Sequence, residues 1–279
     1  MKSAPAEVNQ LEDIEIELLL EGMYRHYGFD FRNYAPASIK RRIHESMRSE
    51  GVLSVSGFQE KVLHDPACLE RLLYRLSVNV TSMFRDPTFF QTFRAKVVPL
   101  LRTYPFVRIW HAGCSTGEEV YSMAILLQEE DLYQRCRIYA TDMSKEVLRK
   151  AREGIFPLAS MQEYTANYMK AGGQRFFSDY YTAHYDSVIF SSSLKTNLIF
   201  SEHNLVTDGS FNEFHVILCR NVMIYFNKTL QERVHNLIYE SLSVLGVFGL
   251  GNKESLRFTP RESFYEELDH RDRLYRKVR

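Results

Sequence analysis

The sequence lacks a long hydrophobic run. Its longest nearly uncharged apolar stretch, around residues 242–250, is about half as long as a membrane-spanning helix, which needs roughly 20 residues. The N-terminal residues are acidic, whereas a secretory signal peptide begins with basic residues and continues with apolar ones. We therefore expect a cytoplasmic protein with no membrane-inserted segment.

Cysteine is also scarce. The four cysteines lie far apart and form neither a Cys-x-x-Cys pair nor a cluster with histidine. This distribution argues against a disulfide scaffold and against a structural zinc site. We expect no metal centre.

The chain carries no net charge, because Lys plus Arg number 35 and Asp plus Glu also number 35. Dedicated nucleic-acid-binding proteins usually carry a large positive excess, since contacts with phosphates supply most of their affinity. We therefore expect no nucleic-acid partner, and any basic function must come from a local patch.

Two patterns divide the chain. From about residue 11 to residue 84, apolar residues recur at helical spacing, which predicts a group of helices. One of them spans residues 37–50 and ends at Gly51, a residue that commonly terminates helices. Shorter helices are predicted over residues 55–63 and 66–76.

After about residue 90, strands alternate with helices. Such alternation is typical of an open α/β sheet with parallel strands. It breaks between residues 154 and 204, where a segment rich in Tyr, Phe and Ser predicts short strands in an insertion. In chain order we expect strands over residues 107–110, 137–142, 214–219, 246–250 and 273–278, and helices over residues 118–130, 145–153 and 228–245.

A strand–turn–helix segment over residues 111–119 carries the first chemical signal. Gly113 and Gly117 allow the backbone to approach a ligand closely, and the helix that follows offers free N–H groups. The segment matches neither the GxGxxG of dinucleotide-binding proteins nor the GxxxxGK[ST] of phosphate-binding loops. Glu118 and Glu119 would repel a phosphate, so the turn suits a cationic, amino-bearing or hydroxyl-bearing ligand. The alternative is that the glycines only form a tight turn.

Asp142 ends the next predicted strand. In nucleotide-binding α/β sheets, an acid at this place accepts hydrogen bonds from the two ribose hydroxyls. The alternative is an N-cap, with Asp142 or Ser144 opening the following helix. A glycine turn and this acid without a phosphate signature indicate a nucleoside that lacks phosphates, and S-adenosylmethionine is the common cofactor of that kind.

Polar residues also follow two later strands. Arg220, Asn221 and Tyr225 come after an apolar strand, and Asn204 and Leu205 come after another. Open sheets bind ligands at the carboxyl ends of their strands, so these residues stand where a ligand would lie. Taken alone, they could equally be ordinary loop residues.

Five strings occur in one order, and together they are far more specific than any one of them. The sequence resembles the chemotaxis receptor methyltransferase (CheR) family, whose members methylate receptor glutamates with S-adenosylmethionine. The resemblance covers nearly the whole chain. The strings are Ser-Val-Asn-Val-Thr-Ser-Met-Phe-Arg-Asp at 77–86, Ala-Gly-Cys-Ser-Thr-Gly-Glu-Glu at 112–119, Ala-Thr-Asp at 140–142, Asn-Leu at 204–205 and Cys-Arg-Asn-Val-Met-Ile-Tyr-Phe at 219–226.

The resemblance implies an α/β fold with a Rossmann-like sheet that serves S-adenosylmethionine-dependent methyl transfer. It implies an N-terminal all-helical substrate-docking domain over residues 1–88 and a methyltransferase domain over residues 89–279. A small antiparallel β subdomain would be inserted at about residues 160–200. Some relatives use this subdomain to hold a peptide tether of the receptor through a glycine-rich loop. Residues 180–186 contain no glycine, so we expect no tether here.

The resemblance also assigns site residues. It implies no role for His111, Gly113 or Cys114, positions at which family members vary. The candidate catalytic residues are Arg85, which could grip the substrate carboxylate, and Tyr225, which could line the methyl-transfer pocket. Contacts with S-adenosylmethionine, and with its product S-adenosylhomocysteine, are implied for Asn79, Thr81, Arg85, Glu119, Asp142, Asn204, Leu205, Arg220 and Asn221.

A basic helix face completes the prediction. On the helix over residues 37–50, Lys40, His44 and Arg48 are spaced four residues apart, with Arg41 beside them. The simple interpretation is a solvated face. Receptor methylation helices are acidic, however, and related enzymes grip them with a basic N-terminal helix, so we expect this face to dock methyl-accepting chemotaxis receptors.

The predicted function is that of a protein-glutamate O-methyltransferase in chemotaxis or chemosensory signalling, and we expect the protein to be a monomer. Two alternatives stay open, namely a non-catalytic S-adenosylmethionine-binding signalling module and an O-methyltransferase acting on another protein carboxylate. A nucleic-acid methyltransferase would need a basic surface and an Asn-Pro-Pro-aromatic motif, and the sequence has neither.

Overall fold

The computed structural model of the chain describes residues 4–76, 81–257 and 259–279. The chain forms two compact units. One comprises Met1–Val78 together with Tyr225–Arg233, and the other comprises Asn79–Ile224 together with Val234–Arg279. We call them the helical unit and the sheet unit.

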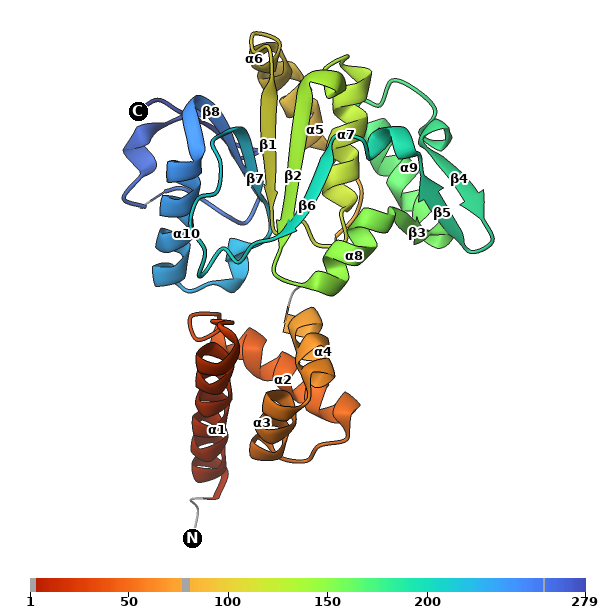
Figure 1. Ribbon diagram of the computed structural model, residues 1–279. Coiled ribbons are helices and arrows are strands. Elements are labelled where there is room, and N and C mark those ends of the chain that lie inside the picture. Colours follow the sequence, from red (N-terminus) through yellow and green to blue (C-terminus); the bar gives the residue numbers. More distant parts are fainter. Residues whose placement is uncertain (1–3, 77–80, 258) are drawn as a thin grey trace. The chain divides into compact units, whose positions relative to one another are not determined.

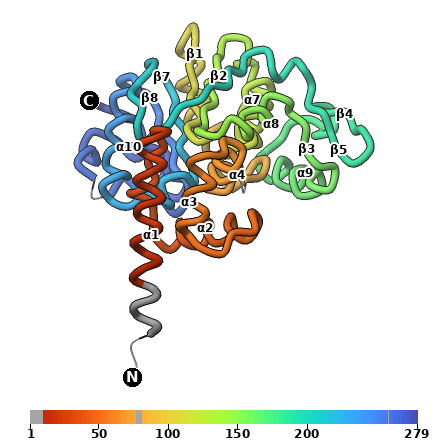
Figure 2. The backbone as a smooth tube through the Cα atoms, turned by 60° about the horizontal axis from the view of Figure 1, so that its bottom comes forward, coloured from red at the N-terminus to blue at the C-terminus, as the bar shows by residue number. Residues whose placement is uncertain are grey.

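Four helices make up most of the helical unit (Figures 1 and 2): α1 (Ala4–Tyr27), α2 (Pro36–Glu50), α3 (Val55–His64) and α4 (Pro66–Leu76). Helix α1 packs on α3, and α2 packs on α4. Helix α2 begins with a proline, whose fixed φ suits a first helical turn, and ends at Gly51, which has a φ of 67°. The helices predicted over residues 37–50, 55–63 and 66–76 are thus confirmed to within one residue at each end.

A later segment of the chain joins the helical unit. The backbone N–H of Ala35 donates to the carbonyl oxygen of Tyr225 at 2.8 Å, and the rings of Tyr34 and Phe226 lie 4.8 Å apart. Helix α10 (Lys228–Ser241) therefore begins in the helical unit and continues into the sheet unit.

A seven-stranded sheet forms the centre of the sheet unit (Figure 1), with strand order β6-β2-β1-β7-β8-β10-β9. The first five strands in this order run parallel, and β10 and β9 are antiparallel. The bounds are β1 (Val107–Ala112), β2 (Cys136–Asp142), β6 (Leu198–Glu202), β7 (Phe214–Cys219), β8 (Leu242–Leu250), β9 (Tyr265–Asp269) and β10 (Leu274–Lys277).

Helices connect and cover these strands. Helix α7 (Glu118–Glu129) follows β1, and α8 (Lys145–Glu153) follows β2, as the alternating pattern predicts. Before β1, α5 (Pro87–Thr92), a short π-helical turn η1 (Phe93–Val97) and α6 (Val98–Leu101) run on continuously.

The sequence prediction was wrong about where α10 ends. A helix was predicted over residues 228–245, but α10 ends at Ser241 and β8 begins at Leu242. Leu242 pairs with Phe214 of β7, and the pairing shifts register before Val216. Pairing with a neighbouring strand therefore overrides a local apolar pattern that suits either structure.

The insertion contains a helix as well as the predicted short strands. Strands β3 (Ile155–Pro157), β5 (Ser187–Phe190) and β4 (Tyr181–His184) form a separate antiparallel sheet in that order, accompanied by α9 (Met161–Lys170). Strand β6, which lies in the same irregular stretch of sequence, instead pairs with β2 at the edge of the main sheet. The predicted class, an α/β sheet with an N-terminal helical part and a small antiparallel β sheet, is confirmed.

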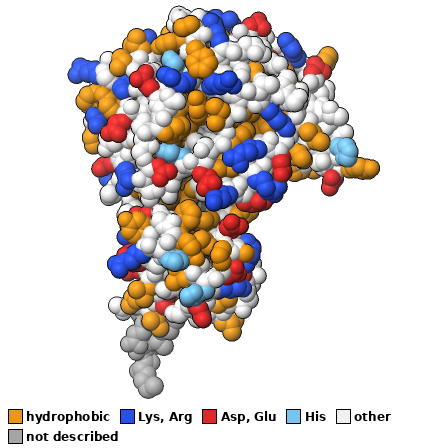
Figure 3. Space-filling model, in the orientation of Figure 1, with side chains coloured by type: hydrophobic (Ala, Val, Ile, Leu, Met, Phe, Trp, Pro, Cys, Tyr) orange, Lys and Arg blue, Asp and Glu red, His pale blue; other side chains and the backbone are white. Residues whose placement is uncertain are grey.

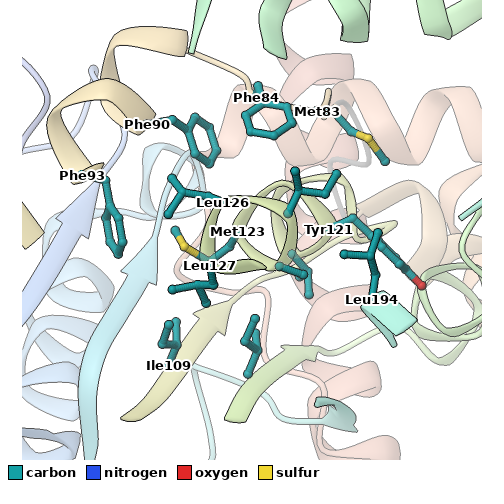
Figure 4. Close-up of a cluster of buried hydrophobic side chains, with 14 of the residues drawn as sticks. Met83, Phe84, Phe90, Phe93, Ile109, Tyr121, Met123, Leu126, Leu127 and Leu194 are labelled. Carbon is teal, nitrogen blue, oxygen red and sulfur yellow. The ribbon is translucent and has the colours of Figure 1, made fainter. Parts of the chain in front are cut away.

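The main core lies between the sheet and α7 (Figure 4). Met123, Leu126 and Leu127 of α7 are fully buried together with Phe84 and Phe90. Burying each such side chain contributes about 1.5–3 kcal/mol, so this core fixes α7, and with it the turn that precedes α7, against the sheet.

The surface carries both signs of charge. In the face shown in Figure 3, Lys and Arg side chains are interspersed with Asp and Glu. Within the described residues, no helix combines the length and apolarity needed to cross a bilayer.

Candidate S-adenosylmethionine site

Four strand ends meet at one edge of the main sheet. Gly113 follows β1, Asp142 ends β2, Asn204 follows β6 and Arg220 follows β7. These strands are parallel neighbours, since Ala112 pairs with Thr141 and Asp142 with Glu202. The structure thus brings together the predicted residues of four separate strings at the edge where open sheets bind ligands.

The glycine turn after β1 is held by close contacts. Gly113 has a φ of 79° and Gly117 a φ of 94°, conformations that side chains disfavour. A Cβ atom at Gly113 would lie 2.6 Å from Cγ2 of Val222, so the loop after β7 packs directly against this turn. The N–H groups of Gly113 and Cys114 both donate to the carbonyl oxygen of Thr141 at 2.9 Å. Gly113 is therefore required by the packing, as the tight-turn alternative predicts, although the family resemblance implies no role for it.

The two glutamates that open α7 face different surroundings. Glu118 is buried, accepts a hydrogen bond from the Thr116 hydroxyl at 2.6 Å and lies 3.5 Å from the Tyr164 hydroxyl. Burial raises the pKa of Glu118. Glu119 instead lies among charged partners.

Arg220 forms ion pairs with both Glu119 and Asp86. Arg220 donates from Nη1 to Glu119 at 2.7 Å and from Nη2 to Asp86 at 2.9 Å, and its side chain has no exposed surface. The guanidinium carbon also lies 3.9 Å from the centre of the Phe89 ring. His111 Nδ1 lies 2.9 Å from the other oxygen of Glu119. Burial alone would raise the pKa of Glu119, but Arg220 and His111 outweigh it and lower that pKa to about 2.

Sequence reasoning missed two members of this network. Asp86 lies inside one of the family strings, but nothing in its spacing connects it with Arg220, which is 134 residues away. It has a left-handed φ of 55° directly before α5. His111 is buried in β1, and its neighbours in sequence give no sign that it contacts Glu119.

Asp142 ties the end of β2 to the glycine turn. One carboxylate oxygen accepts from the N–H of Ser115 at 3.0 Å, and the other accepts from the N–H of Ser144 at 3.2 Å. The side chain of Ser144, the residue before α8, makes no capping bond. The alternative interpretation, a simple N-cap for α8, therefore accounts for the bond from Ser144 but not for the bond from Ser115. Asp142 is 8% exposed, and burial raises its pKa.

The loop after β6 lies next to Asp142. The N–H of His203 donates to the carbonyl oxygen of Asp142 at 3.2 Å. Asn204 stabilises a turn, because its side-chain oxygen accepts a hydrogen bond from the backbone N–H of Val206 at 3.0 Å. Leu205 is buried.

The remaining predicted site residues are less closely defined. Thr81 and Arg85 are partly buried before α5, and Arg85 is engaged in interactions with its surroundings. Asn79 lies outside the described residues. Tyr225 belongs to the helical unit, where the guanidinium carbon of Arg42 lies 5.4 Å from its ring centre.

The basic face of α2 is partly occupied by α1. Lys40 Nζ lies 2.8 Å from a carboxylate oxygen of Glu12 and 3.0 Å from one of Asp13, and His44 contacts the other oxygen of Glu12. Arg41 and Arg48 are exposed; Arg41 pairs with Glu45 of the same helix at 3.3 Å, and Arg48 Nε donates to the His44 carbonyl oxygen.

Arg42 is the one arginine of α2 that is buried. It donates two hydrogen bonds of 2.8 Å to the carbonyl oxygens of Arg75 and Leu76 at the end of α4. Arg42 was not among the residues predicted to dock the receptor. Its role is to satisfy helix-end carbonyls that would otherwise be unpaired.

The acidic side chains at this edge of the sheet suit a cationic ligand with hydroxyl and amino groups. Three carboxylates, those of Glu119, Asp142 and Asp86, gather there. In the part of the chain that the structure describes, the buried atoms Arg220 Nε and His111 Nε2 have no hydrogen-bond partner. S-Adenosylmethionine, which carries a positive sulfonium, an ammonium and ribose hydroxyls, fits this chemistry. No group of three His, Cys, Asp or Glu residues within the described ranges could hold a metal ion.

Comparisons with known proteins agree with S-adenosylmethionine as the ligand. Residues 79–270 match the family described as "CheR methyltransferase, SAM binding domain", and residues 14–77 match "CheR methyltransferase, all-alpha domain". The Cher3 protein of Pseudomonas putida is 52% identical over 95% of this chain and 97% of its own length.

More distant relatives match most of the chain as well. The chemotaxis protein methyltransferase of Listeria monocytogenes is 26% identical over 83% of this chain and 86% of its own, and that of Salmonella typhimurium is 28% identical over 90% and 87%. A solved S-adenosylmethionine-dependent methyltransferase of Geobacter sulfurreducens, 13% identical over 57% of this chain and 46% of its own, overlaps only weakly, with a TM-score of 0.32. The assignment to a family therefore rests on sequence similarity. This chain belongs to the CheR methyltransferase family, and its sheet unit is a domain that binds S-adenosylmethionine.

Proposed function

We propose that the protein transfers the methyl group of S-adenosylmethionine to glutamate side chains on the acidic helices of chemoreceptors, forming glutamate methyl esters. It would thus act as a protein-glutamate O-methyltransferase. Two relatives that match along most of their length are named chemotaxis protein methyltransferases. The observation that carries the proposal is the buried Glu119–Arg220–Asp86 network at the ligand-binding edge of a sheet of this family.

The reaction requires no general base from the protein. When bound, S-adenosylmethionine supplies a methyl group activated by its positive sulfur. A glutamate carboxylate has an ordinary pKa near 4.3, so the nucleophile is already ionised at neutral pH and needs no general base. The residues of this chain have to bind, orient and desolvate the two reactants.

Roles for individual residues follow from their placement. Asp142, at the end of β2, would accept hydrogen bonds from the ribose hydroxyls, since each of its oxygens accepts a backbone hydrogen bond and has a second lone pair. Glu119, kept ionised by Arg220 and His111, would attract the positive cofactor. Asn79, Thr81, Asn204, Leu205 and Asn221 would complete the cofactor contacts.

Arg85 and Tyr225 are proposed to act on the substrate. A guanidinium can hold a carboxylate through two parallel hydrogen bonds, and Arg85 is our candidate for this role. Full pairing would also weaken the nucleophile, so Arg85 would serve to orient rather than to neutralise. Tyr225 would line the methyl-transfer pocket.

Cofactor binding gives the first test. Titration calorimetry with S-adenosylhomocysteine should show binding, and Asp142→Ala should weaken it about 10- to 100-fold, because a charged hydrogen-bond acceptor contributes about 1.5–3 kcal/mol. Asp186→Ala, which removes an exposed carboxylate from the turn between β4 and β5, is the matched control and should change nothing. Equal affinity in Asp142→Ala and the unchanged chain would contradict the ribose role of Asp142.

The docking role of α2 is tested separately. Reversing the two exposed arginines in the double variant Arg41→Glu/Arg48→Glu should raise the KM for an acidic receptor fragment about tenfold or more, because each reversal replaces attraction by repulsion. The affinity for S-adenosylhomocysteine should stay unchanged. The control is Arg257→Glu/Arg271→Glu, which reverses two exposed arginines of the sheet unit.

Outcomes of the methylation assay separate the proposal from its alternatives. Methyl esters on receptor glutamates would support it. Binding of S-adenosylhomocysteine without any transfer would indicate a non-catalytic signalling module, and transfer only to other proteins would indicate a different protein carboxylate as substrate. An unchanged KM in the α2 double variant would remove α2 as the docking surface.

A further inference from the structure

A buried carboxylate outside the family strings holds the loop that follows β7. Glu254 is 6% exposed and lies four residues after the end of β8. Its oxygens accept four backbone hydrogen bonds, from the N–H groups of Asn221 at 2.8 Å, Val222 at 2.9 Å, Met223 at 2.8 Å and Gly251 at 2.7 Å.

Three of these donors are consecutive residues of one turn. Successive backbone N–H groups that point inward form a small anion-binding concavity, and here the anion is a side chain of the same chain. Asn221 adopts the left-handed φ of 61° that such a turn needs. Without Glu254, the buried N–H group of Met223 and the partly buried N–H groups of Asn221 and Val222 would lose their acceptor, which is costly.

The turn connects Glu254 with the glycine turn of the cofactor site. Val222, at the centre of the three, packs so closely on Gly113 that a Cβ atom there would lie 2.6 Å from it. A Cβ atom at Gly251 would likewise lie 2.7 Å from Nδ2 of Asn221. Arg220, which pairs with Glu119, immediately precedes the turn. A shift of the turn would therefore move residues on two sides of the cofactor site.

We infer that Glu254 is a positioning residue for S-adenosylmethionine binding, acting through the turn at residues 221–223 on Gly113, Arg220 and Asn221. The inference rests on the proposed function, in which Asn221 contacts the cofactor and Arg220 keeps Glu119 ionised. It goes beyond that function because Glu254 is not itself an implied cofactor contact and holds Asn221 only through its backbone N–H.

The competing interpretation is that Glu254 only stabilises the fold. The chain offers a matched comparison in Glu129, the last residue of α7. Its carboxylate is fully buried and accepts from the Tyr180 hydroxyl at 2.9 Å and the Gln174 N–H at 3.0 Å, and it also contacts Tyr168 and Arg94. Both carboxylates are buried acceptors of several bonds, but only Glu254 is linked to the glycine turn.

The experiment compares Glu254→Gln with Glu129→Gln in the full chain. The amide keeps the size of the side chain but replaces an acceptor oxygen by a donor, which repels two of the four N–H groups. We measure the thermal unfolding midpoint and the Kd for S-adenosylhomocysteine by calorimetry, at a temperature where both variants are folded. Both variants should unfold at lower temperature. Only Glu254→Gln should bind S-adenosylhomocysteine about tenfold or more weakly.

Two further variants keep the inference testable if Glu254→Gln does not fold. Val222→Ala removes the Cγ atoms that contact Gly113 and leaves the backbone hydrogen bonds in place. The affinity of this variant for S-adenosylhomocysteine should therefore fall, while its unfolding midpoint should change less than that of Glu254→Gln. Glu254→Asp retains both acceptor oxygens on a shorter side chain and should recover part of the affinity lost in Glu254→Gln.

The results that overturn the inference are distinct from those that overturn the proposed function. Unchanged affinity in Glu254→Gln, an equal loss in Glu129→Gln, or unchanged affinity in Val222→Ala would make Glu254 a purely structural residue. A chain that binds S-adenosylhomocysteine normally but methylates no receptor would overturn the proposed function and leave the positioning role of Glu254 standing.

Discussion

Arg220→Met is expected to lower the free energy of unfolding by about 3–5 kcal/mol, the range found when one partner of a buried ion pair is removed. Arg220 has no exposed side-chain surface, and it separates two carboxylates, those of Glu119 and Asp86. Methionine fills much of the space over the Phe89 ring but leaves both carboxylates without their cation. Chemical denaturation of the two chains measures the difference.

The double variant Arg220→Met/Glu119→Gln is the matched control. Because it also removes one of the stranded charges, it should be more stable than Arg220→Met alone. A loss below about 1 kcal/mol in Arg220→Met, the size expected of an exposed pair, would contradict the buried network.

The pH dependence of this loss has a definite sign. In the unchanged chain the pKa of Glu119 is about 2, below its ordinary value near 4.3, so its contribution to stability is fully present above that ordinary value and is lost as the pH falls toward 2. Without Arg220, only His111 opposes the effect of burial, so we expect a higher pKa for Glu119, and protonation then relieves a poorly paired charge. The difference in stability between the two chains should therefore shrink as the pH is lowered from 7 to 4.

Glu129→Gln should produce the second large effect, a loss of about 3–5 kcal/mol, because it disrupts a buried charge with several donors. Glu129 ends α7, while its partners Tyr168 and Tyr180 belong to the insertion that contains α9, and Arg94 belongs to η1. This carboxylate therefore fastens the insertion to the main sheet. Chemical denaturation measures the total loss.

Hydrogen exchange locates the effect of Glu129→Gln. Amides of β3, β4 and β5 should exchange faster in the variant, while those of β1 and β2 should change less. Glu153→Gln is the control, because Glu153 is well exposed and pairs with Arg149 on the surface of α8; its loss should stay within about 0.5 kcal/mol. Uniform exchange changes across the sheet unit would contradict a local fastening role.

Prediction from the sequence succeeded where local pattern decides the structure. A short apolar strand followed by glycine or a polar residue fixes both the strand and the place of its end, which is why Gly113, Asp142, Asn204 and Arg220 could be assigned to one edge. Parallel strands carry their ends to the same side, so no knowledge of side-chain contacts was needed.

It failed where partners are distant in the chain. Arg220 and Asp86 are 134 residues apart, and Glu254 is 33 residues from Asn221, so no periodicity links them. The start of β8 was missed for a related reason, because a run of leucine and valine suits either structure until a neighbouring strand pairs with it. The missed residues are those that hold the site rather than those that line it.

The ion pairs between α1 and α2 bear on how an acidic partner would be attracted. Lys40 and His44 already face carboxylates of the same chain, so a receptor glutamate could reach them only by exchanging places with Glu12 or Asp13. Such an exchange conserves the number of ion pairs and yields little net attraction. The affinity of this face would then depend on Arg41 and Arg48, and added salt would weaken it less than a face of unpaired basic side chains would suggest.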